Sequence, residues 1–67
     1  MRTEIQRLRK ERGMSQAELA AAVGVTRQTI ISIENGRYTA SLLLAYKLAR
    51  FFGASIEEVF DFSDVEV

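Results

Sequence analysis

The sequence predicts an all-α protein, a compact bundle of five short helices. Three observations support this prediction. Apolar residues recur at the three- and four-residue spacing of a helix face along most of the chain. Glycine and the helix-capping residues serine and threonine divide the chain into short segments. No segment of useful length before residue 61 alternates apolar and polar residues as a half-buried strand does, and no internal repeat is visible.

The first two helices are predicted on either side of a glycine. Residues 2–12 are strong helix formers, and Gly13 follows where a C-cap glycine would stand. Ser15 and Glu18 have the spacing of a capping box and open a second helix of about two turns, which ends at Gly24. The apolar faces consist of Ile5 and Leu8 in the first helix and of Leu19, Ala20 and Val23 in the second.

Three more helices are predicted in the rest of the chain. Thr26 caps a third helix over residues 27–34, Ser41 opens a fourth, and Ser55 opens a short fifth helix with acidic residues in its first turn. The stop signals are Asn35 and Gly36 after the third helix and Gly53 after the fourth. The buried stripe of the fourth helix consists of Leu42, Ala45, Leu48, Ala49 and Phe52, and the fifth helix runs through Ile56, Val59 and Phe60.

The tail, residues 61–67, leaves two interpretations open. Phe62, Val65 and Val67 alternate imperfectly with acidic residues, so the tail is either a short C-terminal strand or a frayed end. A strand over residues 62–67 could pair with the same strand of a second copy, which would close an exposed edge.

Charge is divided along the chain, although the net charge is zero. Residues 1–50 contain all nine basic residues and four acidic ones, whereas residues 51–67 contain five acidic residues. This division suits a basic face for nucleic acid with an acidic end directed away from it. Chance segregation of charge in a small chain is the alternative.

The composition disfavours several classes of function. Without Cys or His there is no disulfide framework, ordinary zinc site, or thiolate or imidazole catalyst, so we expect no metal and no cofactor. The five acidic residues at one end have no accompanying nucleophile or ligand set, so we do not expect an enzyme. No apolar run reaches the roughly 18 residues of a membrane span and residues 1–10 lack a signal-like apolar segment, so we expect one cytoplasmic domain over residues 1–67 and no membrane partner.

Residues 15–36 have the pattern of a helix-turn-helix, in which one short helix braces another against a DNA groove. Gly24 suits the tight turn because glycine adopts positive φ without steric cost. Ile30 and Ile33 are three positions apart and must face the bundle, which leaves a polar outward face on the third helix.

On that outward face we expect Arg27 and Gln28 to read bases. A guanidinium group pairs with the O6 and N7 edge of guanine, and a glutamine amide pairs with the N6 and N7 edge of adenine. Ser32 can donate or accept at several bases, and Ile31, expected to be exposed, could pack on a thymine methyl group. Taken singly, these residues could also be ordinary surface side chains.

Three segments of the chain carry a family resemblance. The segments Ser-Gln-Ala-Glu-Leu-Ala at 15–20, Val-Thr-Arg-Gln-Thr-Ile at 25–30 and Ile-Glu-Asn-Gly-Arg at 33–37 resemble the Cro/C1-type helix-turn-helix family, also called the xenobiotic response element family. The likeness continues through 41–42 and 48–49 to 56–60 and so covers all but the last seven residues. It implies a lambda-repressor-like fold and regulation of transcription by binding double-stranded DNA.

The resemblance also implies residue roles. The third helix becomes the recognition helix, with Arg27, Gln28 and Ser32 at base-reading positions and Thr29 and Ile31 near the groove edges. The residues implied or suited to contact phosphate are Gln16, Thr26, Asn35, Arg37 and Tyr38. Arg9 and Glu34 map onto a structural ion pair, although both could instead be independent surface charges.

A homodimer is expected because the predicted core cannot cover every apolar side chain, especially in the region of about 51–67. The expected interface consists of Leu43, Tyr46, Phe51, Val59, Phe62 and Val65. Two-fold pairing would separate the recognition helices by about 34 Å and match an inverted-repeat operator, with repression more economical than activation. The alternatives are an antitoxin-type module that masks a toxin protein and autoregulates its operon, and a helix-turn-helix used only for assembly.

Overall fold

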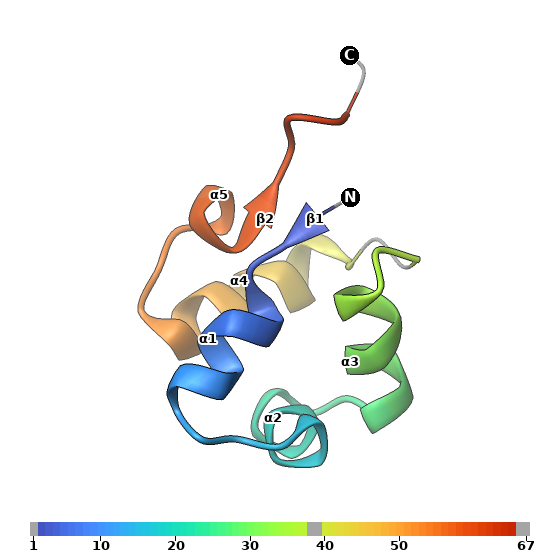
Figure 1. Ribbon diagram of the computed structural model, residues 1–67, viewed down its shortest axis with the longest axis vertical. Helices are drawn as coiled ribbons and strands as arrows, with labels where there is room; N and C mark the ends of the chain where they lie inside the picture. Colours follow the sequence, from blue (N-terminus) through green and yellow to red (C-terminus); the bar gives the residue numbers. More distant parts are fainter. Residues whose placement is uncertain (1, 38–39, 66–67) are drawn as a thin grey trace.

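Five helices and two short strands follow one another in the computed structural model, which describes residues 2–37 and 40–65 (Figure 1). The elements are β1 (Arg2–Thr3), α1 (Ile5–Glu11), α2 (Gln16–Val23), α3 (Arg27–Glu34), α4 (Leu42–Phe52), α5 (Ile56–Val59) and β2 (Phe60–Asp61). The fold class predicted from the sequence, a five-helix bundle, is therefore confirmed.

The predicted capping residues begin four of the helices. The side chains of Ser15, Thr26, Ser41 and Ser55 each accept a hydrogen bond from the backbone N–H three residues later. α2 and α5 have complete capping boxes, because the Glu18 and Glu58 carboxylates accept hydrogen bonds in return from the backbone N–H groups of Ser15 and Ser55 at 2.8 and 2.9 Å. Local sequence therefore determines where these helices begin.

All five helices contribute to one core. The large side chains with no exposed surface are Ile5, Leu19, Ile30, Ile33, Leu48 and Val59. The prediction for the first residue of α4 was wrong: Leu42 is 79% exposed, whereas Leu44 is buried. Leu42 is the first residue after the N-cap, where the helix has just left the loop, and the buried face of α4 begins at Leu44.

The termini form a small sheet that the sequence did not predict in this form. β1 pairs antiparallel with β2, with Arg2 opposite Asp61 and Thr3 opposite Phe60, so that segments from the start and the end of the described chain lie side by side (Figure 1). α1 consequently begins at Ile5, not at residue 2.

The predicted position of the C-terminal strand was also wrong. Phe60, expected in the fifth helix, has extended backbone angles and a side chain only 3% exposed, because leaving the helix there turns its ring into the core. Among residues 62–65 a turn forms instead of a strand, with the Val65 N–H donating to the Phe62 carbonyl at 3.0 Å. The rest of the predicted strand, residues 66–67, lies outside the described residues.

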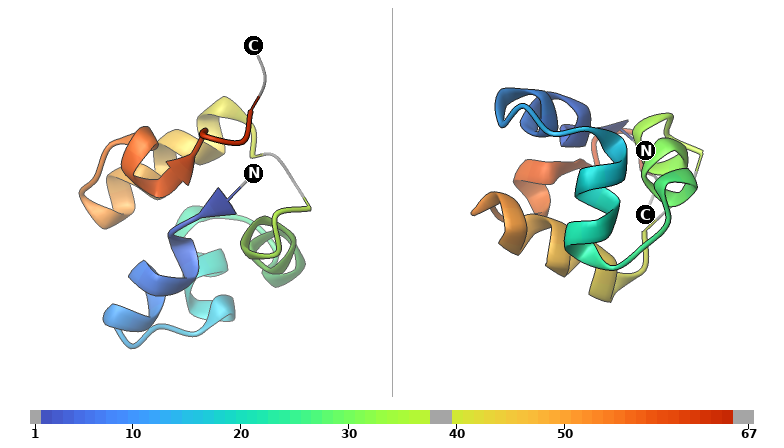
Figure 2. Two further views of the ribbon diagram at one scale, coloured as in Figure 1. Left: turned by 45° about the horizontal axis from the view of Figure 1, so that its top comes forward. Right: turned by 90° about the horizontal axis from the view of Figure 1, so that it is seen from below.

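The turn between α2 and α3 fixes how these two helices meet. Gly24 has φ 75° and ψ 34°, and the Val25 N–H donates to the Ala20 carbonyl at 2.9 Å, which closes the C-terminus of α2. Val25 packs partly buried against the core. α2 then packs against both α3 and α4, and α3 also lies against β1 (Figure 2), which leaves one side of α3 on the surface.

Candidate nucleic-acid interface

α3 presents two different faces. Ile30 and Ile33 have no exposed surface and attach the helix to the core, whereas Arg27 and Gln28, in its first turn, are exposed. The other predicted readers, Thr29, Ile31 and Ser32, are half-buried at the borders between the two faces. The expectation of an exposed Ile31 was therefore wrong: its side chain is half-buried, although helical periodicity alone directs it away from Ile30 and Ile33.

The structure joins Arg9 of α1 to Glu34 of α3 by a bidentate ion pair. The Arg9 Nε and Nη2 atoms donate to Glu34 at 2.8 and 3.1 Å, and the two side chains are only 9% and 4% exposed. Arg9 Nη1 donates to the Met14 carbonyl at 2.9 Å. The hydrogen bonds to Glu34 raise the pKa of Arg9 above its ordinary value, against the opposing effect of burial. The pair thus fixes α1 to α3 through two nearly buried side chains.

The Gln16 side chain extends this pair toward the outward face of α3. Its Nε2 atom donates to Glu34 Oε1 at 3.2 Å, and its Oε1 atom accepts from Arg27 Nη2 at 3.2 Å. We call these four residues, Arg9, Glu34, Gln16 and Arg27, the Arg9–Arg27 network. The resemblance predicted the Arg9–Glu34 pair, which the structure contains. It assigned Gln16 to phosphate and gave no sign of the contacts of Gln16 with Glu34 and Arg27, because partners 18 and 11 residues apart leave no local pattern.

The remaining residues expected to contact phosphate flank α3. Thr26 Oγ1 accepts from the Thr29 N–H at 3.2 Å and so is occupied as the N-cap. Asn35 is the C-cap of α3 and is exposed, as is Arg37, whose N–H donates to the Ser32 carbonyl at 3.0 Å. Tyr38 lies outside the described residues.

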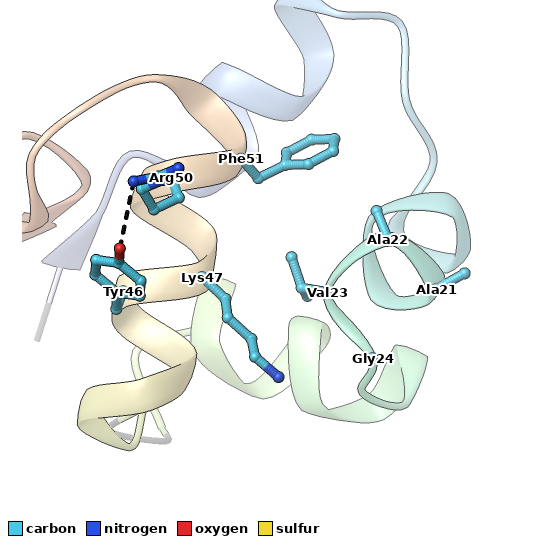
Figure 3. A pocket seen from close by; sticks show the side chains of 8 residues that line it. All are labelled: Ala21, Ala22, Val23, Gly24, Tyr46, Lys47, Arg50 and Phe51. Carbon is cyan, nitrogen blue, oxygen red and sulfur yellow. Dashed lines mark hydrogen bonds between the residues drawn. The ribbon is translucent and has the colours of Figure 1, made fainter.

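A second surface feature is an open groove between α2 and α4 (Figure 3). Its lining residues are Ala21, Ala22, Val23, Gly24, Tyr46, Lys47, Arg50 and Phe51. Arg50 donates to the Tyr46 hydroxyl at 3.3 Å and its guanidinium lies 5.8 Å from the centre of that ring. The described lining contains two cations, Lys47 and Arg50, and no carboxylate, so the groove carries part of the positive charge of the first 50 residues.

The predicted dimer residues divide into exposed and buried sets. The exposed large apolar side chains are Leu42, Leu43, Tyr46, Phe62 and Val65, with exposed fractions between 42% and 79%. Phe51 is half-buried and packs edge-on against the Phe52 ring at 5.2 Å. The expectation for Val59 was wrong: it has no exposed surface, because α5 turns this side chain into the core.

Residues 2–37 and 40–65 contain neither a metal-binding cluster nor a membrane-spanning helix. In this part of the chain no three His, Cys, Asp or Glu residues are grouped so that they could hold a metal ion. No helix of the described chain has the length and apolar character needed to cross a membrane.

Comparison with known proteins agrees with this architecture. Residues 5–59 match the family model described as Helix-turn-helix. A protein of Archaeoglobus fulgidus, described as an uncharacterized HTH-type transcriptional regulator, is 54% identical over 67 residues, which are all of this chain and 96% of that protein. The cryptic phage CTXphi transcriptional repressor RstR of Vibrio cholerae is 34% identical over 97% of this chain and 59% of its own length.

A solved structure gives the same result for the fold. The restriction-modification controller protein C.AhdI from Aeromonas hydrophila superposes with a TM-score of 0.75 at 32% identity, over 84% of this chain and 85% of that one. The family-model match, over residues 5–59, covers α1 to α5. The chain therefore belongs to the Cro/C1-type helix-turn-helix family and has its lambda-repressor-like fold.

Proposed function

We propose that the protein is a transcriptional regulator that binds double-stranded DNA sequence-specifically, with α3 in the major groove. The observation that carries the proposal is the division of α3: Ile30 and Ile33 fix it to the core, while Arg27 and Gln28 extend from its first turn into solvent. Recognition helices of this class use N-terminal side chains to contact base edges. The relatives named as regulators and as a repressor support the same role.

Base reading follows from the side chains on this face. Arg27 pairs with guanine and Gln28 with adenine, each bidentate contact contributing about 1 to 3 kcal/mol of discrimination. Ser32 contributes a hydroxyl, and Thr29 and Ile31 contact the groove edges with their methyl groups. Their half-buried positions limit them to shallow contacts.

Phosphate contacts position α3 in the groove. Asn35 and Arg37 are exposed just beyond α3, where an amide and a guanidinium group can reach the DNA backbone. The N-terminus of α2 adds backbone N–H groups and the positive end of a helix dipole. These contacts contribute affinity that falls as salt rises, because cation binding to phosphate releases counterions.

A homodimer and an inverted-repeat operator complete the proposal. The molecule measures 33 × 22 × 20 Å, so one protomer covers one half-site, and two protomers are needed for half-sites about 34 Å apart. The exposed side chains of Leu42, Leu43, Tyr46, Phe62 and Val65 supply apolar area for such an association. Occlusion of a promoter by the bound dimer accounts for repression without an enzymatic activity, and the names of the relatives favour this role over that of an antitoxin.

The test is selection of bound sites from a random duplex pool by the purified protein, followed by sequencing. We expect an enriched inverted repeat whose preference at one base pair per half-site is lost in Arg27→Ala and at another in Gln28→Ala. Gln6→Ala, an exposed glutamine on α1, is the control and keeps the full preference. Enrichment of no sequence by the unaltered protein would overturn the proposal.

A further inference from the structure

The groove between α2 and α4 is separate from the proposed DNA-binding face. In the right-hand view of Figure 2, α2 lies between α3 and α4, and both of these helices pack against it. The groove opens on the α4 side of α2, whereas Arg27 and Gln28 extend from α3 on the other side. A molecule bound in the groove therefore leaves the outward face of α3 accessible to DNA.

The shape of the groove suits a polypeptide segment. It has a volume of about 660 Å³ and is open to solvent. Sites for small molecules instead enclose about 70–90% of the surface of the ligand. Apolar residues from both helices line the groove, and we call four of them the groove floor: Ala21, Ala22, Val23 and Phe51. This floor can accept an aromatic or aliphatic side chain from a bound chain segment.

Two cations border the groove floor without an acidic partner. Lys47 and Arg50 are exposed, and the described lining contains no carboxylate. Neither cation forms an ion pair with any residue in the ranges 2–37 and 40–65. Figure 3 shows the Lys47 side chain extending from α4 toward the Gly24 end of α2. The charge of the groove is therefore complementary to carboxylates on a bound segment.

A neighbouring aromatic side chain orients one of these cations. Arg50 Nη1 donates to the Tyr46 hydroxyl at 3.3 Å, and the guanidinium lies 5.8 Å from the centre of the Tyr46 ring. Because the hydroxyl group is neutral, it restrains the guanidinium without neutralising its charge. Less side-chain freedom then remains to be lost when a carboxylate binds. Tyrosine and arginine are also the residue types that most often contribute strongly to protein–protein binding.

We propose that this groove binds an acidic peptide segment of another protein: carboxylates of the partner pair with Lys47 and Arg50 while an apolar side chain packs on the groove floor. The inference goes beyond the proposed function, because the partner is a protein and binds a different face. A phosphate backbone would satisfy the cations but leave the groove floor without an apolar partner. A segment with carboxylates beside an aromatic or aliphatic side chain satisfies both.

The first experiment selects ligands for the purified full chain from a phage-displayed library of random peptides of about twelve residues. We expect enriched peptides in which Asp or Glu flanks an aromatic or aliphatic residue. A synthetic copy of the enriched sequence should bind Lys47→Glu/Arg50→Glu about tenfold more weakly. The same double variant should itself enrich basic peptides from the library, which a protein that merely fails to fold would not do.

Two further variants separate the groove floor from general charge effects. Ala22→Gln, which fills part of the floor without changing the charge, should weaken binding of the synthetic peptide about fivefold. Lys10→Glu removes an exposed cation of α1 and should leave the affinity unchanged. Enrichment of no acidic peptide, or an affinity unaffected by Lys47→Glu/Arg50→Glu, would overturn the proposal.

The second experiment tests the two other occupants, the DNA backbone and the acidic tail of a second copy. The synthetic peptide should bind within about twofold of its original affinity when the protein is saturated with the selected operator. A free peptide of residues 60–67 should bind about tenfold more weakly than the selected one. Competition by the operator, or binding of the 60–67 peptide as tight as that of the selected peptide, would overturn the proposal. If no operator is selected, the proposed function fails, while the peptide selection still decides this inference.

Discussion

The buried ion pair between Arg9 and Glu34 shows how much one side chain can determine. It joins α1 to α3, and Arg9 also binds the Met14 carbonyl in the connection to α2. Both charges are almost entirely removed from water. Loss of either partner would leave the other as an unpaired buried charge, which destabilises the folded protein. We therefore expect the pair to specify how α1, α2 and α3 are placed relative to one another, and to contribute less to the free energy of unfolding than an apolar pair of the same size would.

We expect Arg9→Ala to lower the free energy of unfolding by about 3 to 5 kcal/mol, because it leaves a buried carboxylate without its main partner. The double variant Arg9→Met/Glu34→Leu should recover most of this loss, since neither charge is then buried. Urea unfolding followed by circular dichroism measures both. A double variant no more stable than Arg9→Ala would contradict this explanation.

Gly24 is the single residue on which the turn of the helix-turn-helix depends. Its φ of 75° is in the left-handed region, and a Cβ atom built there has no neighbour within 4 Å. Gly24→Ala should thus cost about 1 to 2 kcal/mol from backbone strain alone. Gly24→Asn should cost less, because asparagine tolerates this conformation. Thermal unfolding of the two variants checks the order, and equal losses would contradict the explanation by backbone strain.

At the scale of elements, the capping boxes of α2 and α5 make stability depend on pH. The Ser15 N–H, and second its hydroxyl group, lower the pKa of Glu18, and Ser55 lowers the pKa of Glu58 in the same way. A carboxyl group whose pKa is lower when folded stabilises the fold above its unfolded pKa, about 4.3. This stabilisation is lost as the pH falls through the folded pKa.

We expect the double variant Glu18→Gln/Glu58→Gln to keep its melting temperature at pH 7, because glutamine also completes a capping box. Between pH 5 and about pH 3 its melting temperature should fall less than that of the unaltered protein, since neither box then titrates. Calorimetry over this range is the measurement. Glu57→Gln, an exposed neighbour in α5, is the control and should retain the steep acid dependence.

At the scale of the whole molecule, small size limits the core and leaves apolar side chains outside it. A chain of this length buries only about 60% of the surface of its unfolded form. Leu42, Leu43 and Tyr46 of α4 stay exposed, as do Phe62 and Val65 after β2. Their exposure supports the proposed homodimer, while the burial of Val59 assigns that residue to folding.

Substitutions at Leu43, Phe62 and Val59 test whether the exposed apolar side chains serve self-association and the buried one serves folding. Leu43→Glu and Phe62→Glu should weaken self-association at least tenfold and leave the melting temperature of the monomer nearly unchanged. Val59→Ala should lower the free energy of unfolding by about 1 to 3 kcal/mol, through lost burial and a cavity. Sedimentation equilibrium and thermal unfolding measure the two effects. A dimer unaffected by both glutamate variants would place the interface elsewhere.

The sequence alone determined the features that depend on neighbours in the chain. The capping residues Ser15, Thr26, Ser41 and Ser55 mark helix starts because a side chain reaches a backbone N–H three residues away. The spacing of Ile30 and Ile33 predicted the inward face of α3 because helical periodicity is itself local.

Tertiary structure decided what depends on residues distant in the chain. The pairing of Arg2–Thr3 with Phe60–Asp61 converted an expected helix end into a strand, because the N-terminus offers hydrogen-bonding partners that no local pattern reveals. Val59 entered the core and Leu42 left it according to where α5 and α4 pack. Gln16 lies between Glu34 and Arg27 for the same reason: only the folded chain brings an acceptor on one side and a donor on the other within hydrogen-bonding distance of one amide.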